Sequence, residues 1–295
     1  MSLFDGHSHI NINNSRDNII ELLNNYKLYL KEKGIYKTVI SINPFVKENT
    51  CYDKHSTKIF PYNGNEIISI CQKCGKIIYS GDDYYKKYND LLLNNCCDDF
   101  FNVFLMLSIC QTTIQNNIDY FIEKYGKKIS GLKLYTAFSS VILDEIKINN
   151  KGLPCSIHCS KYNNQIPSTM LNFIKNYNGN IILAHFASLD YSAIEELKQM
   201  ENVYIDIAPA FQIYEECIKM HKKSCLLDCY GINSVYDLYK RLFECFDIKR
   251  IIWGTDYPYS DVNNEINAIK SFSLTKNEFD MVTNQNIRCA LKRHS

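Results

Sequence analysis

The sequence lacks the features that mark several common classes of protein. Its 33 basic and 32 acidic residues give a net charge of +1, so there is no general electrostatic case for binding nucleic acid or an anionic membrane. No apolar run is long enough to span a bilayer, and no charged-then-apolar leader opens the chain. No Gly-x-Gly-x-x-Gly follows an expected strand, which weakens a dinucleotide-binding fold. The expected partner is therefore a small-molecule substrate, and a homo-oligomer stays open.

Cysteine, by contrast, is abundant. The chain has 13 cysteines, an odd number, and no secretory signal precedes them. A disulfide framework needs an oxidising compartment and paired cysteines. The sequence therefore predicts a reduced, cytoplasmic protein in which some thiolates bind metal.

Apolar segments typical of strands alternate with helical patterns along the 295 residues. The expected strands are 3–9, 36–42, 102–109, 130–135, 153–158, 180–185, 203–208 and 250–255. The expected helices are 19–30, 84–95, 114–125, 141–148, 168–177, 191–200, 211–222, 235–246 and 276–291. Strands that are apolar on both faces indicate a parallel sheet covered by helices. The pattern predicts an α/β fold, a single (β/α)8 TIM barrel over residues 1–295, with an open doubly wound sheet as the alternative.

The first expected strand ends in a His-x-His motif, within Phe4-Asp5-Gly6-His7-Ser8-His9. Alternate side chains of an extended chain share a face, so His7 and His9 point the same way. Two imidazoles side by side make half of a metal site. An isolated His-x-His is about as often a pair of hydrogen-bonded polar residues, so the other ligands must come from elsewhere in the chain.

Three further strands end in a residue that can bind a metal. Segments 154–158, 181–185 and 251–256 end in His158, His185 and Asp256. A barrel gathers the carboxyl ends of its strands around one mouth, where its active sites lie. For any one of these residues alone, a role as a hydrogen-bonded polar group is at least as good an explanation as metal binding. Together, four histidines and one aspartate at strand ends predict one converging site.

These motifs in combination resemble the amidohydrolase superfamily, in the amidohydrolase-related branch that includes aminocarboxymuconate-semialdehyde decarboxylase. The matching segments are Asp5-Gly6-His7-Ser8-His9, Gly131-Leu132-Lys133-Leu134-Tyr135, Ile157-His158-Cys159, Leu183-Ala184-His185-Phe186, Trp253-Gly254-Thr255-Asp256-Tyr257-Pro258 and the closing segment 284–291. The resemblance spans nearly the whole chain except residues 45–83. It implies a metal-dependent (β/α)8 hydrolase, with decarboxylases and hydratases among the relatives.

The resemblance also implies a role for each residue at the barrel mouth. The ligands of one Zn2+ or similar divalent metal would be His7, His9, His158 and Asp256. His185 would lie beside the metal-bound water as an acid, a base or a polarising group, and Asp256 would also accept a proton. General chemistry agrees, because a bound metal with an open position acidifies water and a neighbouring imidazole can move protons.

Lys133, in the expected fourth strand, has three interpretations. In other branches of the superfamily a lysine on this strand is carbamylated and bridges two metals. A barrel lysine paired with a carboxylate is favoured, because an unmodified cation repels a nearby metal. A clamp for an anionic substrate group is the third interpretation. Lys133 therefore stands as a candidate catalytic residue beside His185 and Asp256.

Residues 45–83 interrupt the alternation of strands and helices and contain a second candidate metal site. The four candidate ligands are Cys51, His55, Cys71 and Cys74. The Cys-x-x-Cys-Gly turn is typical of a zinc knuckle, and segments 67–70 and 77–79 would flank it as a hairpin. The pattern predicts a zinc-ribbon-like subdomain closed around a structural Zn2+. A redox-active Cys-x-x-Cys and unrelated surface residues are the alternatives.

A stripe of cysteine and histidine occurs later in the chain. Its members, spaced four residues apart, are Cys217, His221, Cys225 and Cys229. Residues four apart share one face of a helix. Metal binding by this stripe is one interpretation. Packing of the cysteines as small apolar side chains is favoured, because short motifs often match by chance.

Two classes of function follow from these patterns. The first is a metal-dependent hydrolase of a small molecule, using a metal-activated water at the barrel mouth, with decarboxylation or hydration of a small carboxylate as the alternative reaction. The second is a binding or regulatory protein that carries a zinc ribbon on a degenerate barrel. Candidate ligands at all the expected strand ends favour the enzyme.

Overall fold

Eight parallel strands form a barrel in this computed structural model, which describes residues 2–12, 18–43, 57–62, 66–71, 77–96, 98–109, 112–136, 142–160, 165–220 and 231–294. The strands are β1 (Leu3–Ile10), β2 (Ile35–Ile42), β6 (Phe101–Ser108), β7 (Ile129–Tyr135), β8 (Cys155–Ile157), β9 (Ile181–Leu183), β10 (Val203–Asp206) and β11 (Ile251–Ile252). Each strand pairs with the next barrel strand along the chain. The expected (β/α)8 TIM barrel is confirmed.

The first and last strands close the barrel through main-chain hydrogen bonds. Gly6 N donates to Trp253 O over 3.0 Å, and Asp256 N donates to His7 O over 2.7 Å. The close approach depends on glycine. A Cβ on Gly6 would lie 2.9 Å from Trp253 O, and a Cβ on Gly254 would lie 2.8 Å from His7 Cβ. Closure therefore brings the His-x-His motif of β1 against the segment that carries Asp256.

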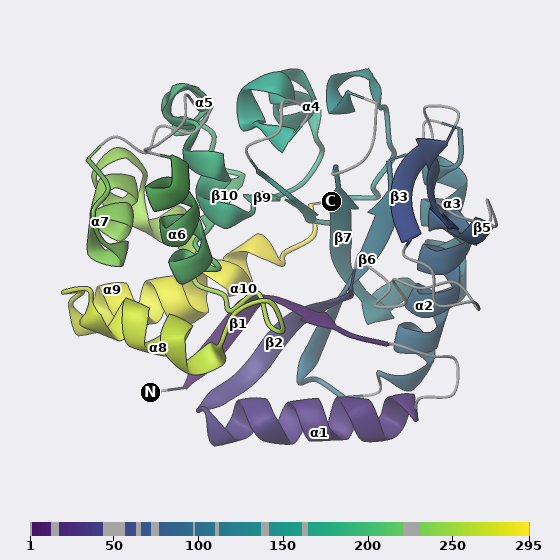
Figure 1. The fold of residues 1–295 in the computed structure, drawn as a ribbon, viewed down its shortest axis with the longest axis horizontal. Coiled ribbons are helices and arrows are strands. Elements are labelled where there is room, and N and C mark those ends of the chain that lie inside the picture. The colour runs from purple at the N-terminus through teal and green to yellow at the C-terminus, as the bar shows by residue number, and fades with distance from the viewer. Residues whose placement is uncertain are drawn as a thin grey trace.

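Helices cover the outside of the barrel (Figure 1). They are α1 (Ile19–Glu32), α2 (Gly81–Asn95), α3 (Ile114–Tyr125), α4 (Leu171–Asn176), α5 (Tyr191–Leu197), α6 (Ala210–Met220), α7 (Val235–Cys245), α8 (Val262–Ser271), α9 (Lys276–Asp280) and α10 (Asn286–Ala290). Each amphipathic helix buries one face. In α1 that face holds Leu23 and Leu30, and in α3 it holds Ile118 and Phe121. Burying one such side chain stabilises the folded state by about 1.5–3 kcal/mol. Among the described residues, no helix has the length and apolarity that crossing a membrane requires.

Three helical segments differ from the expectation. Leu143–Glu145 is a single 3-10 turn, where a helix was expected over 141–148. Helix α8 was not expected at all. The last helix, expected to be continuous, is interrupted between α9 and α10 by the π-turn Met281–Gln285. There Asn286 N donates to Met281 O, and the carbonyl of Val282 accepts the N–H of Trp253 instead. The turn thus ties the closing helix to the end of β11.

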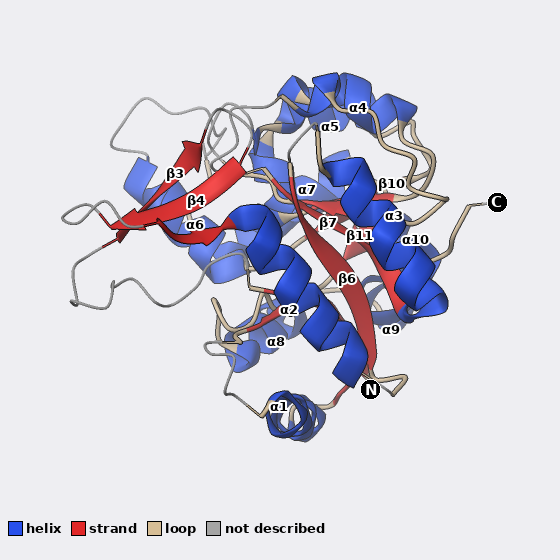
Figure 2. Cartoon of the chain, turned by 90° about the vertical axis from the view of Figure 1, so that its right-hand side faces the viewer, coloured by secondary structure: helices blue, strands red, loops and turns tan. Residues whose placement is uncertain are grey.

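A separate antiparallel sheet follows β2, formed by β3 (Thr57–Tyr62), β4 (Glu66–Cys71) and β5 (Ile77–Ser80). Figure 2 shows it on the left, on the side of the molecule away from the C-terminus. The expected hairpin over 67–70 and 77–79 is confirmed by the pairing of β4 with β5, whereas β3 was not expected. Cys51, His55 and Cys74 lie outside the described residues, so the second zinc site stays a prediction.

Candidate metal centre

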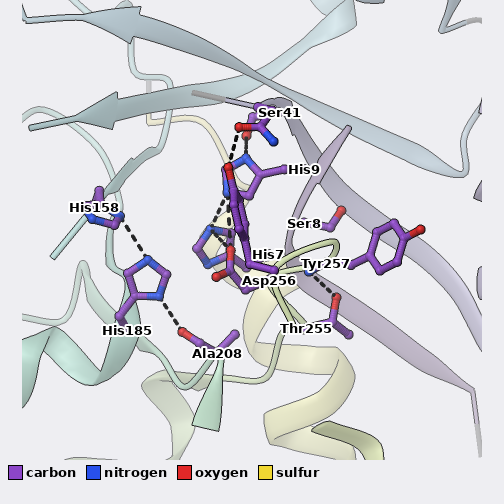
Figure 3. A network of polar contacts seen from close by, with 12 residues as sticks. His7, Ser8, His9, Ser41, His158, His185, Ala208, Thr255, Asp256 and Tyr257 are labelled. Carbon is purple, nitrogen blue, oxygen red and sulfur yellow. Dashed lines mark hydrogen bonds and ion pairs between the residues drawn. The ribbon is translucent and has the colours of Figure 1, made fainter. Parts of the chain in front are cut away.

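Side chains of His7, His9 and Asp256 converge at the carboxyl ends of β1 and β11 (Figure 3). The Nε2 atoms of His7 and His9 are 3.2 Å apart. Asp256 Oδ1 lies 3.5 Å from the first and 3.4 Å from the second. All three residues are buried. The structure therefore unites three of the four residues that the sequence nominated as metal ligands, and we call these three the ligand trio.

Hydrogen bonds on the far side of each imidazole fix which nitrogen carries the proton. His9 Nδ1 lies 3.2 Å from the carbonyl of Ile42, an oxygen that can only accept, and 2.9 Å from Ser41 Oγ. His7 Nδ1 pairs with Oδ2 of Asp206, the last residue of β10. Both rings are therefore protonated on Nδ1 and carry a lone pair on Nε2.

The trio has the dimensions of a metal site. Two imidazole lone pairs and one carboxylate oxygen face one another in buried space, and none of the three atoms brings a hydrogen to share. Such a set of acceptors is stabilised by a cation at its centre. Metal–nitrogen bonds of about 2.0–2.1 Å in a tetrahedral arrangement separate neighbouring ligand atoms by about 3.3–3.4 Å. The three distances in the trio, 3.2, 3.4 and 3.5 Å, match that spacing.

His158 and His185 form a second imidazole pair next to the trio. His185 Nδ1 lies 2.6 Å from the carbonyl of Ala208, which makes it a donor and leaves Nε2 as an acceptor. His158 Nδ1 lies 3.0 Å from that Nε2 and donates to it. His158 consequently keeps a lone pair on Nε2, although it is not part of the trio. The ring centroid of His185 lies 5.1 Å from that of His7.

Lys133 is buried beside His7. Its Nζ lies 2.9 Å from His7 Nε2 and 3.1 Å from Ser156 Oγ. The sequence favoured a carboxylate partner, but the direct partners are an imidazole and a hydroxyl, while Asp206 and Asp256 act on the lysine as nearby charges. Burial lowers the pKa of Lys133 and the two carboxylates oppose the shift. The ammonium group and a metal ion would compete for the same lone pair of His7.

Burial also keeps the imidazoles of His7, His158 and His185 neutral. It lowers the pKa of His7 well below the ordinary value, and the positive charge of Lys133 lowers it further. Burial is likewise the largest cause of the lowered pKa of His158 and of His185. A neutral imidazole retains the lone pair that a metal ligand or a base needs.

Asp206 is the main residue that the sequence analysis missed. Its Oδ1 accepts the N–H of Ala208 over 2.7 Å while Oδ2 holds His7. Burial raises the pKa of this carboxyl, and the charge of Lys133 opposes the rise. An apolar strand that ends in a carboxylate is the signal that singled out Asp256, and the same signal was present at Asp206.

The turn after β9 places His185 with an unusual main chain. Five successive residues, His185–Leu189, have φ between +49° and +59°, and all five are buried. None of them is glycine. A left-handed residue with a Cβ costs about 1–2 kcal/mol. Asp190 ends the turn, where its carboxylate accepts the N–H groups of Ser168 and Ala193 over 2.8 and 3.3 Å. Packing and these bonds together hold the strained turn.

The cysteine stripe is only partly described. Cys217 is buried on α6, while His221, Cys225 and Cys229 lie outside the described residues. Core packing of Cys217 agrees with the favoured interpretation, and metal binding by the stripe stays untested.

A closed parallel barrel with a histidine–carboxylate trio at the carboxyl ends of its strands defines a TIM-barrel protein with a candidate active site. Residues 133–291 match the model of the amidohydrolase family. This chain belongs to that family, and it is an amidohydrolase-family enzyme. A search of curated protein sequences finds no match.

Solved structures share the fold at low sequence identity. A protein from Staphylococcus aureus described as an amidohydrolase has a TM-score of 0.61 at 12% identity, over 99% of each chain. The 5-carboxyvanillate decarboxylase of Sphingomonas paucimobilis has a TM-score of 0.61 at 10% identity, over 99% of each chain. A dihydroxybenzoic acid decarboxylase from a Polaromonas species, with bound manganese and the inhibitor 2-nitroresorcinol, has a TM-score of 0.60 at 10% identity, over 98% of this chain and 96% of its own.

Proposed function

We propose that this chain is a divalent-metal-dependent hydrolase of a small molecule that carries a carbonyl group. The observation that carries the proposal is the ligand trio, in which three acceptor atoms face one another at 3.2–3.5 Å with both Nε2 lone pairs directed inward. The proposed ligands are His7, His9 and Asp256, with His158 as the fourth through its available Nε2. Two or three imidazoles and one carboxylate suit Zn2+, and manganese in the Polaromonas relative makes Mn2+ the second candidate.

A divalent ion at this position would polarise a substrate oxygen and acidify a water molecule. The residues around it supply the remaining chemistry. Asp206 orients His7 and raises its basicity as a ligand, and Ser41 with the Ile42 carbonyl does the same for His9. His185 is the proposed proton-transfer residue, because its Nδ1 is fixed on the Ala208 carbonyl and its Nε2, which accepts the Nδ1–H of His158, can take a proton once it exchanges that contact for one with water or substrate.

Decarboxylation of a small carboxylate is the second candidate reaction, and Lys133 is the observation that favours it. Its Nζ lies 2.9 Å from a member of the trio, where an ammonium group can hold a carboxylate of the substrate. Relatives of the same fold are decarboxylases of 5-carboxyvanillate and of 2,6-dihydroxybenzoate. A binding or regulatory protein on a degenerate barrel is the third candidate, and the complete trio weighs against it.

Metal content and product analysis test the proposal together. Metal-free protein would be loaded with Zn2+ or Mn2+, its metal content measured by elemental analysis, and panels of amides, lactones and aromatic carboxylates assayed for release of acid and of CO2. We expect one barrel metal per chain and turnover that His9→Ala abolishes. Acid release identifies a hydrolase, whereas CO2 release identifies a decarboxylase. A protein whose metal content is unchanged by His9→Ala would contradict the proposal.

The cell compartment and the insertion are also proposals. We propose a reducing, cytoplasmic location, which the free thiols of Cys155, Cys159 and Cys289 support.

We further propose that the segment around β3, β4 and β5 binds a structural Zn2+ through Cys51, His55, Cys71 and Cys74. The support is the hairpin of β4 and β5, because the Cys-x-x-Cys-Gly sequence begins at Cys71, the last residue of β4, and lies before β5.

A further inference from the structure

Glu265, on α8, is a completely buried carboxylate that has no part in the chemistry proposed above. Its Oε1 accepts the hydroxyl hydrogen of Ser260 over 2.7 Å. Its Oε2 accepts the N–H of Ala210 over 2.9 Å. Its main-chain carbonyl accepts the indole N–H of Trp253 over 3.3 Å. One residue thus joins α8 to two segments, the connection that follows β11, through Trp253 and Ser260, and the connection that follows β10, through Ala210.

The first of these segments carries Asp256. Asp256 has a φ of +52°, and the turn that it begins is closed by a hydrogen bond from Tyr259 N to Asp256 O over 2.8 Å. Ser260 is the next residue, and its contact with Glu265 anchors the end of this turn. A non-glycine residue keeps a positive φ only where neighbouring contacts impose it. The Ser260 contact is one of those that do.

The second segment fixes His185. Ala210 is the first residue of α6, and its N–H points to Glu265. Ala208, two residues earlier, provides the carbonyl that accepts His185 Nδ1 over 2.6 Å. The short stretch from Ala208 to Ala210 is therefore held at one end by Glu265 and holds His185 at the other.

We propose that Glu265 is a positioning residue that sets the placement of Asp256 and of His185 at the same time. The proposal rests on the proposed function, because it assumes that Asp256 is a metal ligand and that His185 transfers protons. Partners behind the ligands of metal sites often contribute 10–100-fold to metal affinity or activity, by fixing ligand orientation.

The cost of burying this carboxyl supports a specific role. Burial raises the pKa of Glu265 to about 7, so its charged form is unfavourable in its surroundings. An apolar side chain would fill the same volume without that cost, but it could not hold Ser260 and Ala210 together. Glutamine could do so, because its amide oxygen can accept from Ala210 N while its amide nitrogen donates to Ser260 Oγ.

Co2+ binding provides a test with a spectroscopic readout. Wild-type protein, Glu265→Met and Glu265→Gln would be titrated with Co2+, and the visible absorption band would report the ligands of the ion. The matched control is Glu278→Met, at a partly exposed glutamate that caps the start of α9, away from the barrel mouth. We expect Glu265→Met to bind Co2+ about 10–100-fold more weakly and to shift the band. We expect Glu265→Gln and Glu278→Met to resemble the wild type.

The outcomes separate the two proposals. If folded Glu265→Met matches Glu278→Met in affinity and spectrum, Glu265 does not position the site. If Glu265→Met fails to fold, Ser260→Ala removes only the contact on the Asp256 side, and an unchanged spectrum in that variant overturns the inference. If wild-type protein binds no Co2+, the proposed function fails, and the role of Glu265 fails with it.

Discussion

His7 Nδ1 is hydrogen-bonded to Oδ2 of Asp206, which joins the first strand of the barrel to the seventh across its interior. Both oxygens of Asp206 are used, because Oδ1 accepts the N–H of Ala208. Asparagine has only one acceptor oxygen, so Asp206→Asn must lose one of the two contacts. We expect Zn2+ affinity to fall by about 10–100-fold, measured by chelator competition. Asp237→Asn, at a partly exposed carboxylate on α7, serves as the control and should leave the affinity unchanged.

His185→Asn tests the proton-transfer role. Asparagine can still donate a hydrogen bond, but it cannot exchange a proton near neutral pH. We expect turnover to fall by about 10²-fold or more while most of the barrel metal is retained. Kinetics on the identified substrate and elemental analysis would measure the two effects. Loss of the metal would instead make His185 a ligand, and would favour a two-metal site with a carbamylated Lys133.

Glu265→Gln should change how stability depends on pH. Burial raises the pKa of Glu265 from 4.5 to about 7, so the folded state binds a proton that the unfolded chain releases above pH 4.5. This contribution to stability is complete below pH 4.5 and is lost as pH rises to about 7. The free energy of unfolding of Glu265→Gln, relative to wild type, should therefore increase by about 3 kcal/mol between pH 4.5 and 8. Urea unfolding at several pH values, with chelator present, measures it. Parallel pH profiles would contradict the assignment.

Ala187→Gly should stabilise the fold, unlike most substitutions by glycine. Ala187 has a φ of +49°, and glycine removes a cost of about 1–2 kcal/mol while adding about 0.5–1 kcal/mol of chain entropy loss. We expect a gain of up to about 1 kcal/mol in the free energy of unfolding. Ala193→Gly, at an equally buried position in α5, is the matched control and should lose about 1 kcal/mol. Equal losses in both variants would show that the turn is not strained.

Replacing Cys71 and Cys74 by serine tests the second zinc site. We expect the double variant to contain one metal fewer per chain and to keep the barrel metal, because a closed four-ligand site is independent of the barrel mouth. Cys289→Ser, at an exposed cysteine, is the control. Elemental analysis that shows the same stoichiometry in both variants would refute the site.

The sequence predicts most of the barrel because the short strands are apolar on both faces, a pattern that does not depend on the rest of the fold. Helix α8 was missed because its buried face includes Glu265 and its first turn contains Asn263 and Asn264. A carboxylate in the apolar face and asparagines with low helix propensity both hide the helical pattern. The π-turn was missed because Trp253 takes the Val282 carbonyl, a contact between distant segments that no local pattern records.

The site was predictable where strands end in histidine or aspartate, and unpredictable where tertiary contacts decide the role. His7 and His9 were singled out by their spacing alone. Asp206 also ends a strand, but its role depends on accepting a hydrogen bond from His7 Nδ1, a contact with another strand that no local pattern records. The partners of Lys133 likewise depend on side-chain directions inside the barrel, which the sequence pattern leaves undetermined.

The closure of β1 against the Asp256 segment also sets the order in which the site can form during synthesis. His7 and His9 are made with β1, the first strand of the barrel, whereas Asp256 follows β11, the last. At about 5–20 residues per second, Asp256 is made roughly 10–50 s after His7. Until then the nascent chain offers an incomplete set of ligands and a barrel with an open edge. The complete trio can therefore form only after Asp256 has been made, and a truncated chain that lacks β11 and the residues after it would fail to assemble the trio.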